Sequence, residues 1–442
     1  MSNNVSRLND DKKKILVYTS FFFPWANANT NVLMPIIDYL SKYYTVDIVT
    51  EKHSKNDPSN DVYKGYAVYR YKAKEYFIYK LLCLTEKDPN SVVSSFAHIK
   101  RFILRILHIR FFSELIRRIA ANTAYAPRND CVEVKKLLTT GNYSAILSLS
   151  APIEPQYAVL ILAQHGILEK YNVKWFPFFS DPHATFIGTP FNQRDKLLKL
   201  EYDIYKYADL VFTTPELYQD NKYYILNDFI DKTVPIALAN IRCPQSSIQP
   251  IIFDSKKINC VYVGSFFNVA VRNPEYFFKV ISSCSPNIEV HIICYAEDIP
   301  TKKLREQYLS GRKNIKWHQR MSLQECLSIM QEADILINVG NKCTNQTPSK
   351  IFDYISTGKP IVNFYSIEDD TSKRYLELYP TKCNILETEE LRTSDVETFN
   401  CFCFENAKTI IPFDQIKTLY QGIDSETSCK KFYFAIKHML DS

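Results

Sequence analysis

The sequence contains no run of about 18 uninterrupted apolar residues, which is the length that a helix needs to cross a bilayer. Its first residues, MSNNVSRLNDDKKK, are polar and include no apolar stretch of the kind that a secretory signal requires. Neither membrane insertion nor export is therefore expected. We predict that the protein stays in the cytosol.

Glycine is scarce, with only nine among 442 residues, alongside 21 prolines. Hydrophobic residues make up 46% of the chain and charged residues 23%, values that exclude disordered, collagen-like and low-complexity chains. Aromatic residues reach 14%, which is enough to fill large cores. Because a single core rarely supports more than about 250–300 residues, the length predicts two domains.

Cysteine is present but shows no metal-binding pattern. The 12 cysteines are irregularly spaced, and their one close pair, Cys401-x-Cys403, has no second pair or histidine at zinc-ligand spacing. We expect reduced thiols that are buried or half-buried, with a structural zinc site as the alternative.

Two phosphate-binding motifs are missing. Neither Gly-x-Gly-x-x-Gly nor Gly-x(4)-Gly-Lys-Ser/Thr occurs anywhere in the sequence. Their absence argues against a dinucleotide oxidoreductase and against a P-loop NTPase.

The first half of the chain alternates apolar runs typical of buried strands with segments of helical period. The strands are expected at 14–20, 46–51, 144–152, 173–182 and 208–215, with helices between them. Since βαβ units build parallel sheets with right-handed crossovers, the pattern predicts an α/β domain.

The second half repeats this pattern. We expect strands at 258–266, 288–296, 315–320, 333–340 and 359–366, the last strong one, with a helix at 348–358 that ends at a glycine. The fold class is therefore α/β, with two Rossmann-like, doubly wound parallel sheets that face each other across a cleft. Ligands of such sheets bind outside the carboxyl ends of the strands.

The predicted boundaries follow from these patterns. An N-terminal domain covers 1–240, a linker poor in helical period covers 241–256, and a C-terminal domain covers 257–415. The remaining residues, 416–442, are expected to form a helix that packs back on the N-terminal domain.

The most informative segment is Asn345-Gln-Thr-Pro-Ser-Lys-Ile-Phe-Asp353. A helix that begins near Ser349 and Lys350 offers unpaired N–H groups, a hydroxyl and a positive charge to a phosphate, and Asp353 one turn later suits a ribose diol. Ordinary helix capping with a solvated lysine is the alternative.

PSKIFDYISTGKPIV resembles the nucleotide-sugar segment of GT-B glycosyltransferases, in particular glycosyltransferase family 4 (group 1). The resemblance implies that Ser349 and Lys350 bind the diphosphate of a nucleotide-sugar donor and that Asp353 binds its ribose. Many members carry two glutamates eight residues apart. Here Asp353 takes the place of the second, and Asn345 replaces the first, which usually contacts the sugar.

Three further segments resemble the same family in the same order. CVYVGSFFNVAVRNPEYFFKVI is similar to its first C-terminal strand, turn and helix, which implies donor contacts from Gly264, Ser265 and Arg272. Ser265 stands where many members have a second arginine. FFSDPHATF and the unit LEYDIYKYADLVFTTPEL resemble the Asp-Pro-Trp loop and the helix and strand after it.

The resemblance makes Asp181 and His183 the catalytic candidates. Asp181 would bind an acceptor hydroxyl or stabilise positive charge on the sugar, and His183 would bind a phosphate or a sugar hydroxyl. A turn-capping aspartate and a structural histidine are the alternatives. On the acceptor side, Asn27 and Asn29 replace the family's glycines, so their side-chain amides are expected to replace backbone contacts.

Residues 98–118 combine six Lys or Arg with one Glu and many Ile, Leu and Phe. A basic amphipathic helix of this kind favours contact with an anionic membrane surface, whereas a core-facing helix with a cationic outer side is the alternative. No nucleic-acid-reading motif accompanies it, so a nucleic-acid partner is not expected.

Together these features predict a retaining glycosyltransferase of polysaccharide biosynthesis, peripheral to the inner face of the membrane, that uses a nucleoside-diphosphate-sugar and a glycan or lipid-linked acceptor. No Asp-x-Asp occurs, so no metal and no cofactor are expected. A GT-B epimerase or phosphorylase and a catalytically silent GT-B scaffold at the membrane are the alternatives.

Overall fold

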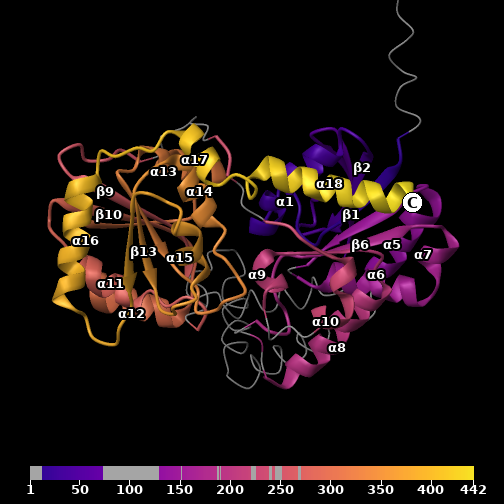
Figure 1. Ribbon diagram of the computed structural model, residues 1–442, viewed down its shortest axis with the longest axis horizontal. Helices are drawn as coiled ribbons and strands as arrows, with labels where there is room; N and C mark the ends of the chain where they lie inside the picture. Colours follow the sequence, from indigo (N-terminus) through magenta and orange to yellow (C-terminus); the bar gives the residue numbers. More distant parts are fainter. Residues whose placement is uncertain are drawn as a thin grey trace, which may run out of the picture.

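The computed structural model describes residues 12–72, 129–150, 152–186, 189, 191–220, 225–237, 241–243, 251–266 and 270–442. The predicted basic helix at 98–118 lies outside these ranges. Within them, no helix combines the length and the apolar character needed to cross a membrane. Figure 1 shows two sheets, each flanked by helices, and we call the two halves the N-domain and the C-domain.

The N-domain contains an eight-stranded sheet in the order β3-β4-β2-β1-β5-β6-β7-β8. The strands are β1 (Lys14–Tyr18), β2 (Thr45–Glu51), β3 (Asn60–Tyr63), β4 (Tyr66–Tyr71), β5 (Ala145–Leu149), β6 (Lys174–Phe179), β7 (Val211–Thr213) and β8 (Thr233–Pro235). Each strand that the apolar runs predicted in this half lies at its expected place. All pairs are parallel except β3 with β4.

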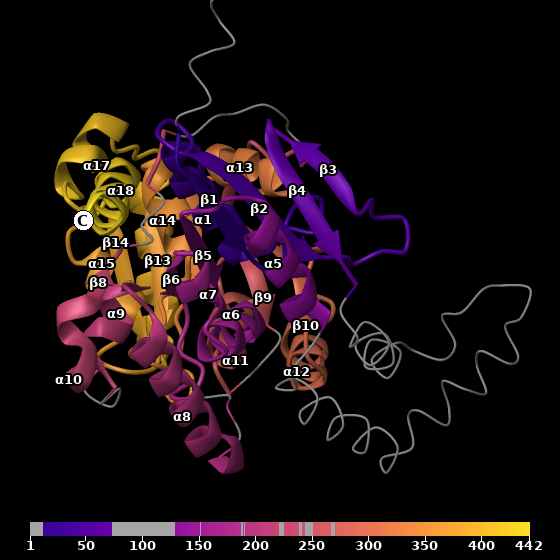
Figure 2. The same ribbon diagram turned by 90° about the vertical axis from the view of Figure 1, so that its right-hand side faces the viewer.

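The β3–β4 hairpin was not predicted, because β3 is exposed and lacks an apolar run. Its turn places Lys64 at φ 50° and Gly65 at φ 90°, backbone values that suit a tight hairpin turn and that glycine adopts without steric cost. The hairpin forms the edge of the sheet beside β2, as Figure 2 shows.

Two apolar layers cover the two faces of the N-domain sheet. The helices of this domain are α1 (Ala28–Leu40), α5 (Asn129–Thr140), α6 (Glu154–Gln164), α7 (Ile167–Lys170), α8 (Phe191–Tyr207), α9 (Pro215–Tyr218) and α10 (Leu226–Phe229). Helices α5, α6 and α8 contribute to one core, and α1 contributes to the other.

The C-domain contains a six-stranded, all-parallel sheet in the order β11-β10-β9-β12-β13-β14. The strands are β9 (Ile258–Phe266), β10 (Ile288–Glu297), β11 (Ile315–His318), β12 (Ile335–Val339), β13 (Ile361–Tyr365) and β14 (Lys382–Leu386). Five of them lie at the predicted places. The edge strand β14 was missed because it alternates buried and half-buried residues instead of forming an apolar run.

Seven helices cover this second sheet and its ends, as far as the described residues show. They are α11 (Glu275–Ser282), α12 (Ile299–Leu309), α13 (Leu323–Glu332), α14 (Lys350–Thr357), α15 (Thr371–Leu376), α16 (Thr393–Asn406) and α17 (Phe413–Leu419). Helix α14 ends at Gly358, whose φ of 73° is the left-handed conformation typical of a helix C-terminus.

The last helix, α18 (Ser425–Asp441), crosses from the C-domain to the N-domain and lies along α1, as the yellow ribbon over the indigo one shows in Figure 1. Phe432 is fully buried in the core beside α1, and its ring stacks on Phe212 of β7 with 3.8 Å between centroids. The chain's final segment therefore completes the core of the first domain.

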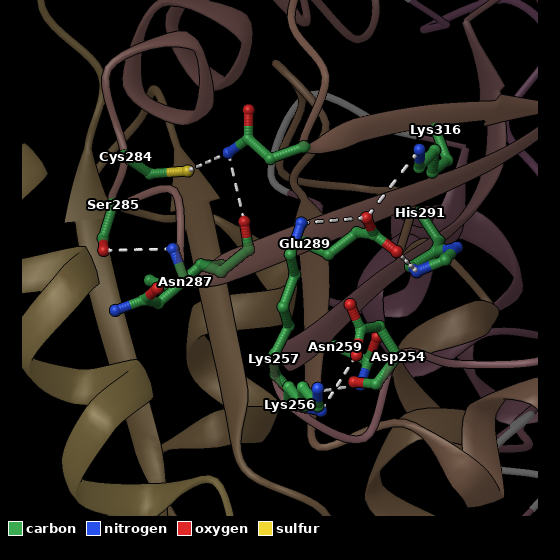
Figure 3. A network of polar contacts seen from close by, with 12 residues as sticks. Asp254, Lys256, Lys257, Asn259, Cys284, Ser285, Asn287, Glu289, His291 and Lys316 are labelled. Atoms are coloured by element: carbon green, nitrogen blue, oxygen red, sulfur yellow. Dashed lines mark hydrogen bonds and ion pairs between the residues drawn. The ribbon is translucent and has the colours of Figure 1, made fainter.

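The amino ends of the C-domain strands are held by a polar network, shown in Figure 3. Both Lys257 and Lys316 form ion pairs with Oε2 of the buried Glu289, at 3.4 and 3.8 Å. The other oxygen, Oε1, lies 3.3 Å from Nε2 of His291. Asn259 donates to the backbone oxygen of Asp254 at 3.1 Å. The chain is thus fixed to the sheet where it enters β9.

Candidate functional site

The loops at the carboxyl ends of the two sheets contact each other, and Asp181 lies where they meet. Its Oδ1 accepts a hydrogen bond from Nε2 of Gln346 in the C-domain at 2.6 Å. Its Oδ2 accepts one from Nδ2 of Asn29 at the start of α1, at 3.1 Å. A carboxylate after β6 is therefore shared by two amides, one from each domain.

The two asparagines predicted on the acceptor side have different roles. Asn27 is the N-cap of α1, and its Oδ1 accepts hydrogen bonds from the backbone N–H and the hydroxyl of Thr30, at 2.9 and 3.0 Å. The side-chain oxygen of Asn27 is therefore committed to its own helix. Asn29 is the member of the pair that contacts Asp181.

His183 lies two residues after Asp181 on the same turn. Burial lowers the pKa of its imidazole to about 4, although the Asp181 carboxylate acts in the opposite direction, so the ring is neutral near pH 7. Its Nε2 is buried without a hydrogen-bond partner among the described residues. A buried ring nitrogen without a partner is unusual, and a ligand group that reached it would supply the missing hydrogen bond.

A buried carboxylate that the sequence analysis did not single out supports this turn. Glu201, in the middle of α8, is fully buried, and its Oε1 accepts the backbone N–H groups of His183 and Ala184, at 3.3 and 3.2 Å. It lies on the same helix face as the buried Leu197 and Ile204. A glutamate inside an apolar helix face was the signal that could have identified it.

Asn345, which replaces the family's first glutamate, reaches across to the N-domain. Its Nδ2 donates to Oδ2 of Asp220 at 2.7 Å and to the hydroxyl of Thr185 at 3.1 Å. A glutamate at this position would bring a second negative charge toward Asp220. The amide of Asn345 can instead donate a hydrogen bond to the carboxylate of Asp220.

A third contact between the domains converges on the buried Glu216 at the start of α9. Its Oε1 accepts the hydroxyls of Thr347 and Tyr375, at 2.8 and 2.7 Å. Residues 345–347 therefore bind three N-domain carboxylates in succession, directly before the predicted phosphate-binding helix start.

That helix start is placed as the sequence indicated, at the carboxyl end of the C-domain sheet. Ser349 is the N-cap of α14, and its side chain makes no capping bond. Nζ of Lys350 lies 3.9 Å from Oδ2 of Asp353. Burial raises the pKa of the Asp353 carboxyl, and the cations Lys350 and Arg242 counteract this. The hydroxyl, the ammonium and the carboxylate thus lie within one helical turn.

Arg272 lies beside the ends of β9 and β12. Its Nε and Nη2 donate to Oδ1 of Asn341, at 3.2 and 2.8 Å, and its Nη1 donates to the backbone oxygen of Ser265 at 3.4 Å. The hydroxyl of Ser265 is buried and has no partner among the described residues. The guanidinium is therefore held in place by hydrogen bonds to neutral groups, and its charge acts on the nearby carboxyl group of Asp370.

Gly264 lies inside strand β9, which continues to Phe266, and not in a turn that approaches a phosphate. A Cβ at this position would lie 2.5 Å from the hydroxyl of Tyr262. The space needed by that tyrosine is thus a sufficient reason for glycine here. Its predicted donor contact has no support from this geometry.

Two acids near Arg272 and Lys342 were also not predicted. Asp370 is the N-cap of α15, and its buried Oδ2 has no partner among the described residues. Burial raises the pKa of Asp370 to about 6 and that of Glu387 to about 7. The C-domain edge therefore holds carboxyl groups that titrate near neutral pH beside its cations.

A pocket of about 580 Å³ opens between the two domains. Thr185, Arg194 and Asp220 line it from the N-domain, and 342–345 and 367–369 line it from the C-domain. Its volume lies within the range typical of small-molecule sites.

No metal-binding arrangement occurs in the described part of the chain, since no three His, Cys, Asp or Glu residues converge there. The eleven described cysteines are free thiols. Cys401 is exposed and Cys403 is buried, so the close pair does not converge on one point.

The sequence matches no family model and no curated protein. Solved structures do match. Sucrose-phosphate synthase from Thermosynechococcus elongatus superposes with a TM-score of 0.62 at 12% identity, over 97% of this chain and 100% of that one. The chain has the GT-B fold.

Two further solved structures superpose on this chain with lower TM-scores. The putative UDP-N-acetylglucosamine 2-epimerase from Listeria monocytogenes gives a TM-score of 0.55 at 9% identity and covers 98% of each chain. The lipopolysaccharide outer core galactosyltransferase WaaB, in its apo form, gives 0.52 at 14% identity, over 96% of this chain and 99% of that one. The predicted fold class is thereby confirmed.

Proposed function

We propose that the protein is a glycosyltransferase that moves a sugar from a nucleoside-diphosphate-sugar to a hydroxyl group of a glycan. The observation that carries the proposal is the segment 345–350. Its first residues contact N-domain carboxylates, including Asp181, and its last residues, Ser349 and Lys350, begin the helix to which we assign phosphate binding. One segment thus connects the two half-sites that sugar transfer requires.

On the donor side, the diphosphate is assigned to Arg272, Lys350, the hydroxyl of Ser349 and the N–H groups that begin α14. Asp353 is assigned to the ribose. These cations and dipoles balance the phosphate charge, so the proposal requires no metal ion. A donor bound in this way places its sugar toward the N-domain loop that contains Asp181.

On the acceptor side, Asp181 accepts a hydrogen bond from the attacking hydroxyl, and the neutral His183 offers its buried Nε2 to a sugar or phosphate oxygen. We propose transfer with retention. The acceptor oxygen attacks the anomeric carbon from the face that the diphosphate leaves, and the hydroxyl proton passes to the departing phosphate oxygen. This course requires no covalent nucleophile from the protein.

An epimerase is the second candidate, because one structure with this fold carries that name. A catalytically silent scaffold protein is the third candidate, since Asn345 replaces a glutamate that many members of glycosyltransferase family 4 carry. Product analysis separates the three. A transferase releases a nucleoside diphosphate, an epimerase returns an altered nucleotide-sugar, and a scaffold changes neither substrate.

The test is a thermal-shift panel of UDP-, GDP- and ADP-sugars, followed by product analysis with the stabilising donor. A specific ligand at 100 times its Kd adds about 2.7 kcal/mol to the free energy of unfolding. If no nucleotide-sugar raises the melting temperature, the donor site proposed here does not exist.

We propose in addition that the acceptor is lipid-linked in polysaccharide biosynthesis and that the basic segment 98–118 contacts an anionic membrane. The support is the sequence of that segment, which lies outside the described residues. Each Lys or Arg near an anionic surface contributes about 1 kcal/mol. Changing Arg101, Arg105 and Arg110 to Glu should release the protein from anionic vesicles in flotation. Equal flotation with neutral and anionic vesicles would contradict this assignment.

A further inference from the structure

The loop after β1 exposes one tryptophan near the proposed acceptor side. Trp25 is 45% exposed, whereas Trp175 is fully buried and the half-buried Trp317 has the guanidinium of Arg305 4.6 Å from its ring centroid. These three are all the tryptophans of the chain. An exposed indole is a large apolar surface that the protein leaves in contact with water.

The indole is fixed in place by the loop that follows β2. Nε1 of Trp25 donates to both carboxylate oxygens of Asp57, at 3.1 Å each. Asp57 also accepts the backbone N–H groups of His53 and Ser54, both at 2.8 Å. The polar edge of the ring is therefore used within the protein, and what remains for a ligand is the aromatic face.

The residues around Trp25 make the loop rigid as well. The backbone oxygen of Phe23 accepts a hydrogen bond from the buried Arg70 at 2.7 Å, and the Phe23 ring stacks on Tyr63 with 4.5 Å between centroids. The backbone N–H of Trp25 bonds to the oxygen of Phe22 at 2.8 Å. A ring held in this manner loses little side-chain entropy when a ligand binds.

The distance to the reacting centre is limited by the chain. Trp25 precedes Asn29 by four residues, which span at most about 14 Å even when extended. Asn29 contacts Asp181 directly, at 3.1 Å. The indole therefore lies within a few sugar units of the carboxylate to which we assign the acceptor hydroxyl, and on the same domain.

We propose that Trp25 is a stacking platform for a pyranose ring of the acceptor glycan, one or more units away from the ring that reacts. A pyranose has an apolar face of C–H groups and a rim of hydroxyls. Its C–H face matches the electron-rich face of an indole whose N–H is already satisfied. The inference rests on the proposed function only in calling this glycan the acceptor.

The experiment uses the intrinsic fluorescence of the full-length protein, since Trp25 is the most exposed of its three indoles. Cellotriose, maltotriose, mannotriose and chitotriose are titrated separately, and at least one should change the emission saturably. Calorimetry, which does not need the indole as a reporter, measures the variants: Trp25→Ala should weaken the binding of that trisaccharide about tenfold, while Trp25→Phe, which keeps a ring, should lose less. Trp317→Phe removes another indole and should leave the affinity unchanged.

A second measurement does not depend on any variant. N-bromosuccinimide should oxidise Trp25 before the two less exposed indoles, and the bound trisaccharide should slow that oxidation, as peptide mapping would show. The proposal is overturned if none of the four sugars alters emission or oxidation, or if the affinity survives in Trp25→Ala. Emission that shifts with lipid vesicles and with no sugar would also overturn it, in favour of a membrane contact.

These outcomes are separable from the donor site. Trp25→Ala should keep the thermal shift that a nucleotide-sugar produces in the unmodified protein. If nucleotide-sugars fail to stabilise the protein but trisaccharides protect Trp25, the proposed transfer fails while the saccharide site stands. If nucleotide-sugars stabilise the protein but no trisaccharide protects Trp25, the stacking platform is rejected and the donor site stands.

Discussion

The two domains present opposite chemistry to each other. The N-domain edge offers the carboxylates Asp181, Glu216 and Asp220, whereas the C-domain edge offers the cations Arg272 and Lys350. Carboxylates accept hydrogen bonds from hydroxyl groups, and cations attract a diphosphate. This difference agrees with the proposed function, in which an uncharged acceptor binds to the N-domain and a charged donor binds to the C-domain.

Like Asp353 and Glu387, the buried Asp370 departs from this division, because it is an acid on the cationic side. Its raised pKa of about 6 means that the folded protein holds a proton between about pH 4 and 6 that the unfolded chain releases, so its contribution to stability falls as the pH rises through that window. Asp370→Asn, which keeps the helix cap, should therefore stabilise the protein at pH 8 by up to about 3 kcal/mol.

Denaturant unfolding at pH 8 and at pH 4 measures this effect. Little difference between variant and parent is expected at pH 4, where the acid is largely protonated in the folded protein. A stabilisation that is equal at both pH values would mean that titration of Asp370 is not its cause.

Removing either cation from the C-domain edge should weaken donor binding. Lys350→Ala and Arg272→Ala should each cost roughly 1.5–3 kcal/mol, the range for hydrogen bonds to charged groups. Calorimetry with the stabilising nucleotide-sugar measures the loss. Lys316→Ala is the matched control, because this lysine belongs to the network at the opposite edge of the same sheet. Unchanged affinity in both cleft variants would place the diphosphate elsewhere.

A substitution on the N-domain edge should lower turnover and leave the affinity for the donor unchanged. Asp181→Asn keeps the size of the side chain but removes the charge and one of the two acceptor oxygens that bind Asn29 and Gln346, and we expect turnover to fall at least tenfold with little change in donor affinity. Steady-state kinetics and calorimetry on the same preparation separate the two quantities. Normal turnover in this variant would return Asp181 to a structural role in its turn.

Much of the fold could be predicted because its strands are buried on both faces. Runs such as 258–266 are mainly apolar and are buried at almost every position, which is typical of a strand in a parallel sheet. The β3 strand was missed for the opposite reason, since Asn60 to Tyr63 are largely exposed and pair only with β4. Exposed edge strands carry no apolar signal.

In the candidate site, too, some contacts could be predicted from the sequence and others could not. The proximity of Lys350 to Asp353 was predictable because the two residues lie one helical turn apart, where sequence spacing fixes geometry. The contact of Glu216 with Tyr375 could not be predicted, because the two residues lie on different domains and far apart in the sequence. Gly264 was assigned to the donor because its segment resembles the first C-terminal strand and turn of the family, and in the structure it lies inside β9 beside the hydroxyl of Tyr262.

The return of α18 to the first domain has a consequence for synthesis. Phe432 covers an apolar face next to Phe212. The ribosome synthesises Phe432 roughly 200 residues after Phe212, a delay of about 10–40 s at ordinary elongation rates. During that interval the face that α18 will cover is open to water and to chaperones. The N-domain is made first, but its core is finished last, after the whole C-domain sheet has emerged.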